Sequence, residues 1–191
     1  MARYSVEHNK QSKEAILASA SRLFRLHGFE GVGIPEIARE AGLTHGTFYA
    51  HFDSKEDLYK EVVNSAGKAR AERLKAATPA TGPGRVRSII SYYLGAEHLQ
   101  AVDRGCIMPG LGGELSRRPS RKGDPVRSQA EAYAEGLITE LVACGQRKPR
   151  ARQIAANLVG GLLMARLLDP EGRAGILDDL RRECLLLVEE K

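Results

Sequence analysis

Apolar residues recur at helical spacing over most of this chain. Ile16, Ala20, Leu23 and Phe24 follow a 3.6-residue period and predict a helix over about residues 10–27. The same pattern predicts further helices near 34–41, 45–51, 54–77, 86–94, 126–146, 150–168 and 174–190, with a short one near 111–115. No segment alternates with the two-residue period of a strand. We therefore predict an all-α protein of nine helices.

Capping and helix-breaking residues divide this pattern into segments. Gly33 and Pro35 suit the start of the second predicted helix, Thr44 suits the N-cap of the third, and Gly42 between them permits a tight turn. A Pro- and Gly-rich cluster over residues 79–84 is the best domain boundary. We expect a helix-turn-helix domain over residues 1–53, a connecting helix over 54–78 and a second helical domain over 79–191.

Two short helices joined at Gly42 have the layout of a helix-turn-helix. Ile37 and Ala38 are expected to face inward, and Phe48 and Phe52, four residues apart, are expected to anchor the third helix. A plain helical hairpin inside a bundle would show the same internal pattern. The pattern alone therefore leaves DNA binding open.

The residues between these anchors favour DNA, because they are polar or small and none is acidic. A helix that enters a groove lined by phosphates avoids carboxylates and uses its N-terminal residues to contact base edges. We predict base contacts from His45 and Thr47, with Gly46 allowing close approach of the backbone. The residues expected to contact phosphates are Thr44, Tyr49, His51 and Lys55. The spacing of His45 and His51 is wrong for a metal pair on one helix face, so we expect no metal and no cofactor.

Composition narrows the class of protein. The chain of 191 residues has a formal net charge of +5, but residues 1–60 carry equal numbers of basic and acidic residues, so bulk charge does not argue for DNA. Three cysteines without a C-x-x-C pair argue against a disulfide framework and a zinc site. No apolar signal segment is present, and the longest uncharged apolar run, residues 158–165, is too short to span a bilayer, so we expect a cytoplasmic protein with no membrane partner.

An enzyme is the main competing class. The motifs of serine hydrolases, zinc peptidases and P-loop nucleotide hydrolases are absent. A small helical enzyme using Cys106 is disfavoured, because a lone cysteine without a histidine base placed by the sequence is weak evidence for catalysis. A nonspecific architectural DNA-binding protein is the other alternative, and it would be more basic over residues 1–60.

Residues 31–58 resemble the N-terminal domain of TetR-type (tetracycline-repressor-like) transcriptional regulators. The resemblance rests on Phe48-Tyr49 before His51-Phe52, followed by Ser-Lys-Glu-x-Leu at 54–58, and it extends over residues 12–62. The family usually has Thr or Ser where Gly33 begins the second helix, which removes a hydroxyl here, and we keep Gly33 among the expected DNA-binding positions. The resemblance implies a repressor dimer on a palindromic double-stranded operator, released by a small-molecule inducer.

The last two predicted helices are apolar on more than one face, whereas a surface helix needs only one apolar stripe. Burial within a monomer would explain this pattern. The resemblance favours a homodimer through these two helices, which would place two recognition helices roughly 34–36 Å apart.

The resemblance also places a ligand cavity among apolar and aromatic residues of the second domain. The candidate ligand-binding residues are Tyr92, Tyr93, Cys106, Met108, Leu111, Leu115, Tyr133, Leu137 and Met164. Any one of these residues is more often plain core than a ligand contact. Residues 105–111 resemble a Gly-Cys segment of one branch of these regulators, in which some members sense electrophiles or oxidants with the thiol. A buried, inert Cys106 is the alternative that we favour.

Overall fold

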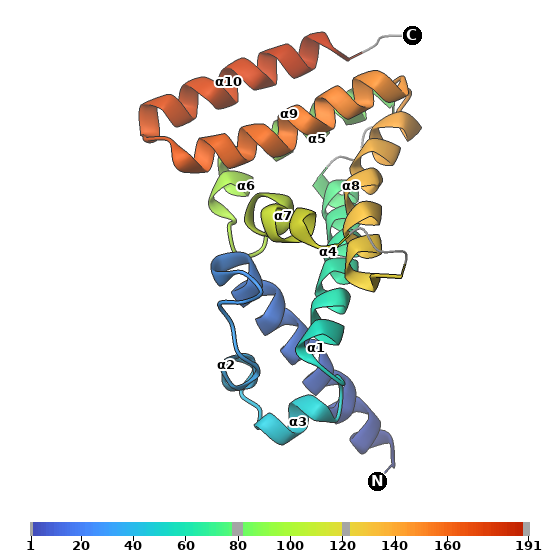
Figure 1. Ribbon diagram of the computed structural model, residues 1–191. Helices are drawn as coiled ribbons and strands as arrows, with labels where there is room; N and C mark the ends of the chain where they lie inside the picture. The colour runs from blue at the N-terminus through green and yellow to red at the C-terminus, as the bar shows by residue number, and fades with distance from the viewer. Residues whose placement is uncertain (1, 78–81, 120–122, 189–191) are drawn as a thin grey trace.

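The computed structural model describes residues 2–77, 82–119 and 123–188, with backbone alone for residues 2–6 and 77. Within these ranges the chain forms ten helices and no strand, so the predicted all-α class is confirmed and the predicted count of nine is wrong by one (Figure 1). The helices are α1 (Ala2–His27), α2 (Ile34–Glu40), α3 (His45–Tyr49), α4 (Lys55–Ala77), α5 (Gly82–Tyr93), α6 (Ala96–Gln100), α7 (Met108–Arg117), α8 (Pro125–Ala143), α9 (Lys148–Leu167) and α10 (Pro170–Leu186).

The first three helices form one end of the molecule, and α4 runs from them towards the other end (Figure 1). Phe24, Ile37, Phe48 and Phe52 are almost completely buried in this region. Helices as short as α2 and α3 are unstable on their own, so their packing against α1 and against each other holds them.

The remaining helices form the other end, where α4 packs along α8 and α10 packs along α9 (Figure 1). Gly161 explains how closely α9 and α10 approach, because a Cβ at this position would collide with Leu180. Gly160 points away from the molecule, since a Cβ there would have no neighbour within 4 Å.

Helix α7 lies between the two ends and contacts α1 (Figure 1). Its residue Gly110 faces the first helix, where an added Cβ would lie 3.0 Å from the carbonyl oxygen of Arg25. The neighbouring α6 was missed by the sequence pattern because five residues are too few to show a helical period.

Helix boundaries differ from the predictions where prolines open a helix. Helices α7 to α10 each have a proline in the first turn, where its missing N–H costs nothing, so they start earlier than predicted. Asp124 and Asp169 cap α8 and α10 by accepting backbone N–H groups. Gly145, with φ of 95°, follows the end of α8, which stops three residues before the predicted end.

Two features singled out in the sequence fall partly outside the described residues. These are residues 79–81 of the predicted domain boundary and residues 120–122 of a basic run at 117–122, which the sequence alone predicts to be a solvated loop. The described part of this run differs from that prediction, because Arg117 ends α7 and Arg118 pairs with Glu56 and Asp124. In the ranges that the structure covers, no helix combines the length and apolarity needed to cross a bilayer.

Candidate DNA-binding site

The turn between α2 and α3 has the geometry predicted from its glycine. Gly42 adopts φ of 69°, in the left-handed region that glycine tolerates best. The backbone N–H of Leu43 donates to the Ala38 carbonyl at 2.9 Å, which folds the chain back on α2. Thr44 then caps α3, because its Oγ1 accepts the Thr47 N–H at 3.3 Å.

The outer face of α3 is open and free of carboxylates. His45, Gly46 and Tyr49 are exposed and Thr47 is half-buried, while Phe48 and Phe52 pack beneath them with ring centroids 5.7 Å apart. The Thr47 hydroxyl lies 2.8 Å from that of Thr44, so the first turn of the helix presents two linked hydroxyls. This arrangement suits donation to acceptors outside the protein.

Neither glycine predicted to contact DNA is required by packing. A Cβ at Gly46 would meet only Thr44 Oγ1 at 3.9 Å, and one at Gly33 would meet only Pro35 Cδ at 3.5 Å. Gly33 is the N-cap of α2 and makes no side-chain capping bond. Both positions therefore have room for a side chain in the free protein.

Tyr49 and His51 differ in exposure and in their neighbours. Tyr49 is 53% exposed and its ring stands edge-on to the ring of His45, with centroids 5.3 Å apart. His51 is half-buried, and its pKa is lowered by burial and by the nearby ammonium of Lys13. His51 is thus a neutral hydrogen-bonding group at pH 7 rather than a cation.

Lys13 is a candidate phosphate contact that the sequence pattern missed. It extends from α1, is exposed, and places its ammonium 5.4 Å from the centre of the Phe52 ring. Nothing in the spacing of α1 marks it, because its place beside the third helix is set by the tertiary fold.

Lys55 lies differently from the other predicted phosphate contacts. Its ammonium sits over the Phe29 ring, 4.1 Å from the centroid, where it makes a cation–π contact. The charge therefore faces the segment between α1 and α2, and a phosphate contact would require the side chain to leave this ring.

The predicted ligand-binding residues occupy several places in the second half of the chain. Tyr93, Met108, Tyr133 and Leu137 line one cavity of about 220 Å³ between α8, α9 and the start of α7. Arg70, Ile138, Arg152 and Val159 also line it and were not among the predicted residues. Their contribution depends on how α4, α8 and α9 pack, which no local pattern reveals.

The other candidates lie outside this cavity. Tyr92 and Cys106 border a narrow space of about 10 Å³, Leu111 and Leu115 are buried in the core, and Met164 is exposed on α9. Cys106 itself is only 4% exposed, and its Sγ accepts from the Tyr133 hydroxyl at 3.5 Å.

A buried histidine organises the backbone at Cys106. His98 Nε2 accepts the Cys106 N–H at 3.0 Å, so Nδ1 carries the proton and donates to the Tyr93 carbonyl, also at 3.0 Å. Burial lowers the pKa of His98 to about 4, and the ring is neutral at pH 7. His98 was not predicted from the sequence, because a single histidine in a helical segment carries no signal of its partners.

An apolar stripe lies exposed along α9. Its members, on the face opposite the core, are Ala156, Gly160, Leu163, Met164 and Leu167. Leu167 is 74% exposed, and Leu186 at the end of α10 is 72% exposed. Large side chains exposed in one continuous strip indicate a surface that another molecule covers.

Known proteins match both the sequence and the fold. Residues 16–62 match the model of the bacterial regulatory proteins of the tetR family. The transcriptional regulator LmrA of Bacillus subtilis (strain 168) is 30% identical over 164 residues, 81% of this chain and 86% of LmrA. The transcriptional repressor NemR of Escherichia coli (strain K12) is 26% identical over 174 residues, 84% of this chain and 86% of NemR.

Solved structures agree. A TetR-family regulator from Streptomyces coelicolor has a TM-score of 0.75 at 25% identity, covering 95% of this chain and 97% of that one. The reduced form of E. coli NemR also has a TM-score of 0.75, covering 94% and 98%, and at 20% identity it supports the fold alone. These relatives are named as regulators of transcription and not as enzymes. The chain therefore belongs to the tetR family of bacterial regulatory proteins and is a helix-turn-helix transcriptional regulator.

Proposed function

We propose that this regulator is a dimeric repressor that binds a palindromic operator through α3 and is released by a small molecule bound between α8 and α9. The observation that carries the proposal is the exposed, carboxylate-free face of α3, mounted on two buried phenylalanines. His45 and Thr47 contact bases, and Gly46 brings the backbone close to the groove floor. The remaining contacts, to phosphates, come from Gly33, Thr44, Tyr49 and His51, together with Lys13. Lys55 joins them only when its side chain leaves the Phe29 ring.

In this proposal the chain has three functional segments. Residues 1–53 bind DNA, residues 54–78 connect, and residues 79–191 bind the ligand and the second protomer. The long α4 belongs to both ends, since it contacts α1 below and α8 above. Movement of α8 around a ligand is therefore transmitted to α1 through α4.

The dimer forms through α9 and α10. The exposed stripe on α9, with Leu163, Met164 and Leu167, is the apolar surface that pairing removes from water. Gly160 in the centre of the stripe has no neighbour, which lets a second helix approach closely. A two-fold axis there sets the separation of the two α3 helices, and correct separation is roughly 34–36 Å, one turn of DNA.

The inducer is a small, largely apolar molecule. Its cavity of about 220 Å³ is lined by Tyr93, Met108, Tyr133 and Leu137, which offer adaptable apolar and aromatic surface. Tyr133 also accepts the Ile107 N–H at 3.4 Å, so a ligand that displaces Tyr133 moves the segment before α7. We favour this route over direct oxidation of Cys106, because that thiol is buried.

Selection of bound duplexes from a random pool tests the proposal. We expect a palindromic sequence that binds orders of magnitude more tightly than scrambled DNA, with two protomers per site. A screen for small molecules that release this DNA then identifies the inducer. Equal affinity for all duplexes at moderate salt would contradict the proposal and favour an architectural DNA-binding protein.

A further inference from the structure

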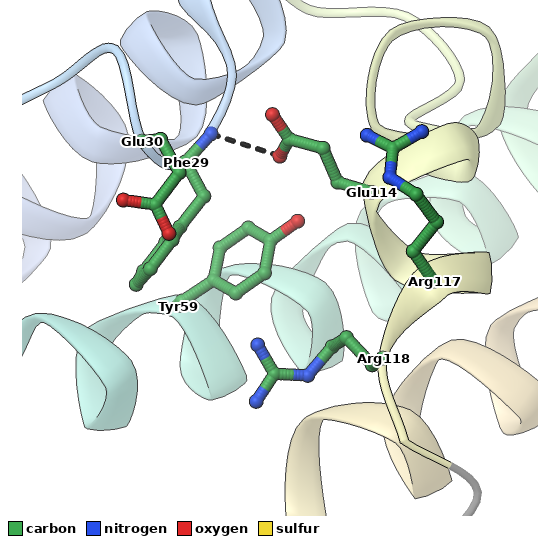
Figure 2. Close-up of a pocket in the computed structure, with 6 residues that line it drawn as sticks. All are labelled: Phe29, Glu30, Tyr59, Glu114, Arg117 and Arg118. Carbon is green, nitrogen blue, oxygen red and sulfur yellow. Dashed lines mark hydrogen bonds between the residues drawn. The ribbon is translucent and has the colours of Figure 1, made fainter.

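A second, separate cavity lies at the junction between the helix-turn-helix and the rest of the chain. It has a volume of about 200 Å³ and is lined by Phe29, Glu30, Tyr59, Glu114, Arg117 and Arg118 (Figure 2). Phe29 and Glu30 follow α1, Tyr59 lies on α4, and the last three belong to α7 and its C-terminal end. None of these residues lines the cavity between α8 and α9.

The Tyr59 hydroxyl has an unmet hydrogen bond in this cavity. The side chain is 1% exposed, and the hydroxyl oxygen has no partner among the described residues. Figure 2 shows it pointing towards α7, beside Glu114. Burial, and then the Glu114 carboxylate, raise the pKa of Tyr59, so the group is a protonated donor at neutral pH. A buried donor without an acceptor is costly, and native proteins rarely retain one.

The aromatic walls and the volume of the cavity indicate the size and character of a ligand that would fit. The rings of Phe29 and Tyr59 lie 4.7 Å apart and tilted, and with Phe24 they form an aromatic cluster at its base. An apolar cavity of about 150 Å³ holds a benzene-sized molecule, so the volume here suits a single ring with one substituent.

The charges around the cavity favour an uncharged ligand. The Arg118 guanidinium already pairs with Glu56 and with Asp124, the latter at 3.1 Å. Glu114 accepts the Phe29 N–H at 2.9 Å and remains a carboxylate on the wall, as does Glu30. An anion would find only Arg117 uncommitted among the described residues and would be repelled by these carboxylates.

We infer that this junction is a binding site for a small, uncharged aromatic molecule with a hydrogen-bond-accepting oxygen, which accepts from the Tyr59 hydroxyl. The site lies where Glu114 and Arg118 of the α7 end contact Phe29 and Glu56 near the helix-turn-helix. A ligand held there changes the relation between α7 and the DNA-binding end. Its effect on operator affinity rests on the proposed function, whereas its binding does not.

Benzamide is a suitable probe, because it is an uncharged aromatic ring with an accepting oxygen. Toluene lacks the accepting oxygen and benzoate carries a charge, so these two compounds serve as comparisons. Benzamide is titrated into the full-length protein while the NMR signal of the Phe29 backbone amide is monitored. The change in this signal should saturate as benzamide binds. Tyr59→Phe should weaken benzamide binding about tenfold, the loss expected for one buried hydrogen bond, and leave toluene binding unchanged. The melting temperature of Tyr59→Phe should equal or exceed that of the parent, because the lost hydroxyl bonds no other described residue.

A matched control separates the two cavities. Ala134→Phe places a ring in the cavity between α8 and α9, which Ala134 lines, and should leave benzamide binding at the junction intact. Equal benzamide affinity in the parent and Tyr59→Phe, or a tenfold loss in Ala134→Phe, would overturn the site. If benzamide binds as expected and operator affinity stays the same at saturation, the effector role is overturned.

Discussion

Arg25, near the end of α1, donates from Nε to the carbonyl oxygen of Gly105 at 3.2 Å. Arg25 is buried, and its Nη1 also donates to the Ser21 carbonyl at 2.5 Å. Gly105 immediately precedes Cys106 and Ile107, whose N–H groups are bound by His98 and Tyr133. The first helix of the DNA-binding end is therefore joined by direct hydrogen bonds to the segment that borders the proposed inducer cavity.

Arg25→Met should uncouple the two ends of the molecule. Methionine keeps much of the apolar volume but leaves the Gly105 carbonyl without its donor, so we expect a loss of about 1–3 kcal/mol in the free energy of unfolding. Operator binding in the parent should change amide hydrogen exchange over residues 105–111, because coupling between sites is reciprocal. In Arg25→Met this response should disappear.

Arg22 on the same helix provides a control. Its ion pair with Glu40 is half-exposed and stays within the DNA-binding end, so Arg22→Ala should cost no more than about 1 kcal/mol and keep the exchange response. A response that survives in Arg25→Met would show that coupling takes another route.

Gly46→Ala should stabilise the free protein and weaken operator binding. Alanine fits, because only Thr44 Oγ1 lies near, at 3.9 Å, and replacing a helical glycine gains about 0.5–1 kcal/mol. The added methyl group projects from the exposed face of α3 that we place in the groove. We expect a higher melting temperature and operator affinity lower by on the order of tenfold. Unchanged affinity would remove Gly46 from the interface.

Thr47→Ala and Lys13→Ala should separate base contacts from phosphate contacts. Loss of a base contact by Thr47 should cost about 1–3 kcal/mol of operator binding and little nonspecific binding. Loss of the Lys13 ammonium should weaken both and reduce the slope of log affinity against log salt by about 0.9. Filter binding on operator and scrambled duplexes at several salt concentrations checks both, and identical profiles for the two variants would refute the roles.

Local chemistry explains why the helix-turn-helix was predictable. The capping by Thr44, the turn at Gly42 and the burial of Phe48 and Phe52 depend on residues within one short segment, and the structure confirms each of them. The position of Lys55 at the start of α4 was predictable from local sequence. Its contact with Phe29 was not, because that contact depends on how the segment after α1 folds back.

The cavities were less predictable, because each is assembled from distant helices. Tyr133 and Tyr93 carry apolar character in the sequence, but Arg70 joins them only through the packing of α4 on α8, where it donates to the Tyr133 carbonyl at 2.7 Å. Met164, predicted beside the ligand, lies instead on the exposed stripe of α9. The sequence pattern marked α9 as apolar on more than one face but did not identify the neighbour of each face.

His98 should make the folded protein sensitive to mild acid. Its pKa falls from 6.5 to about 4 on folding, so protonation favours the unfolded state. The stabilisation is complete above pH 6.5 and is lost as the pH falls towards 4, by about 2 kcal/mol at pH 5. The His98→Gln variant keeps an amide that can donate and accept but does not titrate. Its free energy of unfolding should therefore differ between pH 7.5 and pH 5 by about this much less than that of the parent. Denaturant unfolding of both proteins at pH 7.5 and pH 5 measures this free-energy difference. The same difference in parent and variant would show that other groups titrate instead.

Leu167→Glu should convert the proposed dimer to monomers. Leu167 is 74% exposed at the end of the apolar stripe on α9, so a carboxylate there is harmless in a monomer but must lose its hydration in the paired state. Sedimentation should show the mass of one chain, and the melting temperature extrapolated to low protein concentration should match the parent. Operator affinity should fall by more than any single contact on α3 accounts for, because each protomer then binds one half-site alone. Val142 on α8 is also exposed but lies off this stripe, so Val142→Glu should leave the mass and the operator affinity unchanged. If Leu167→Glu remains a dimer, the interface does not lie on α9.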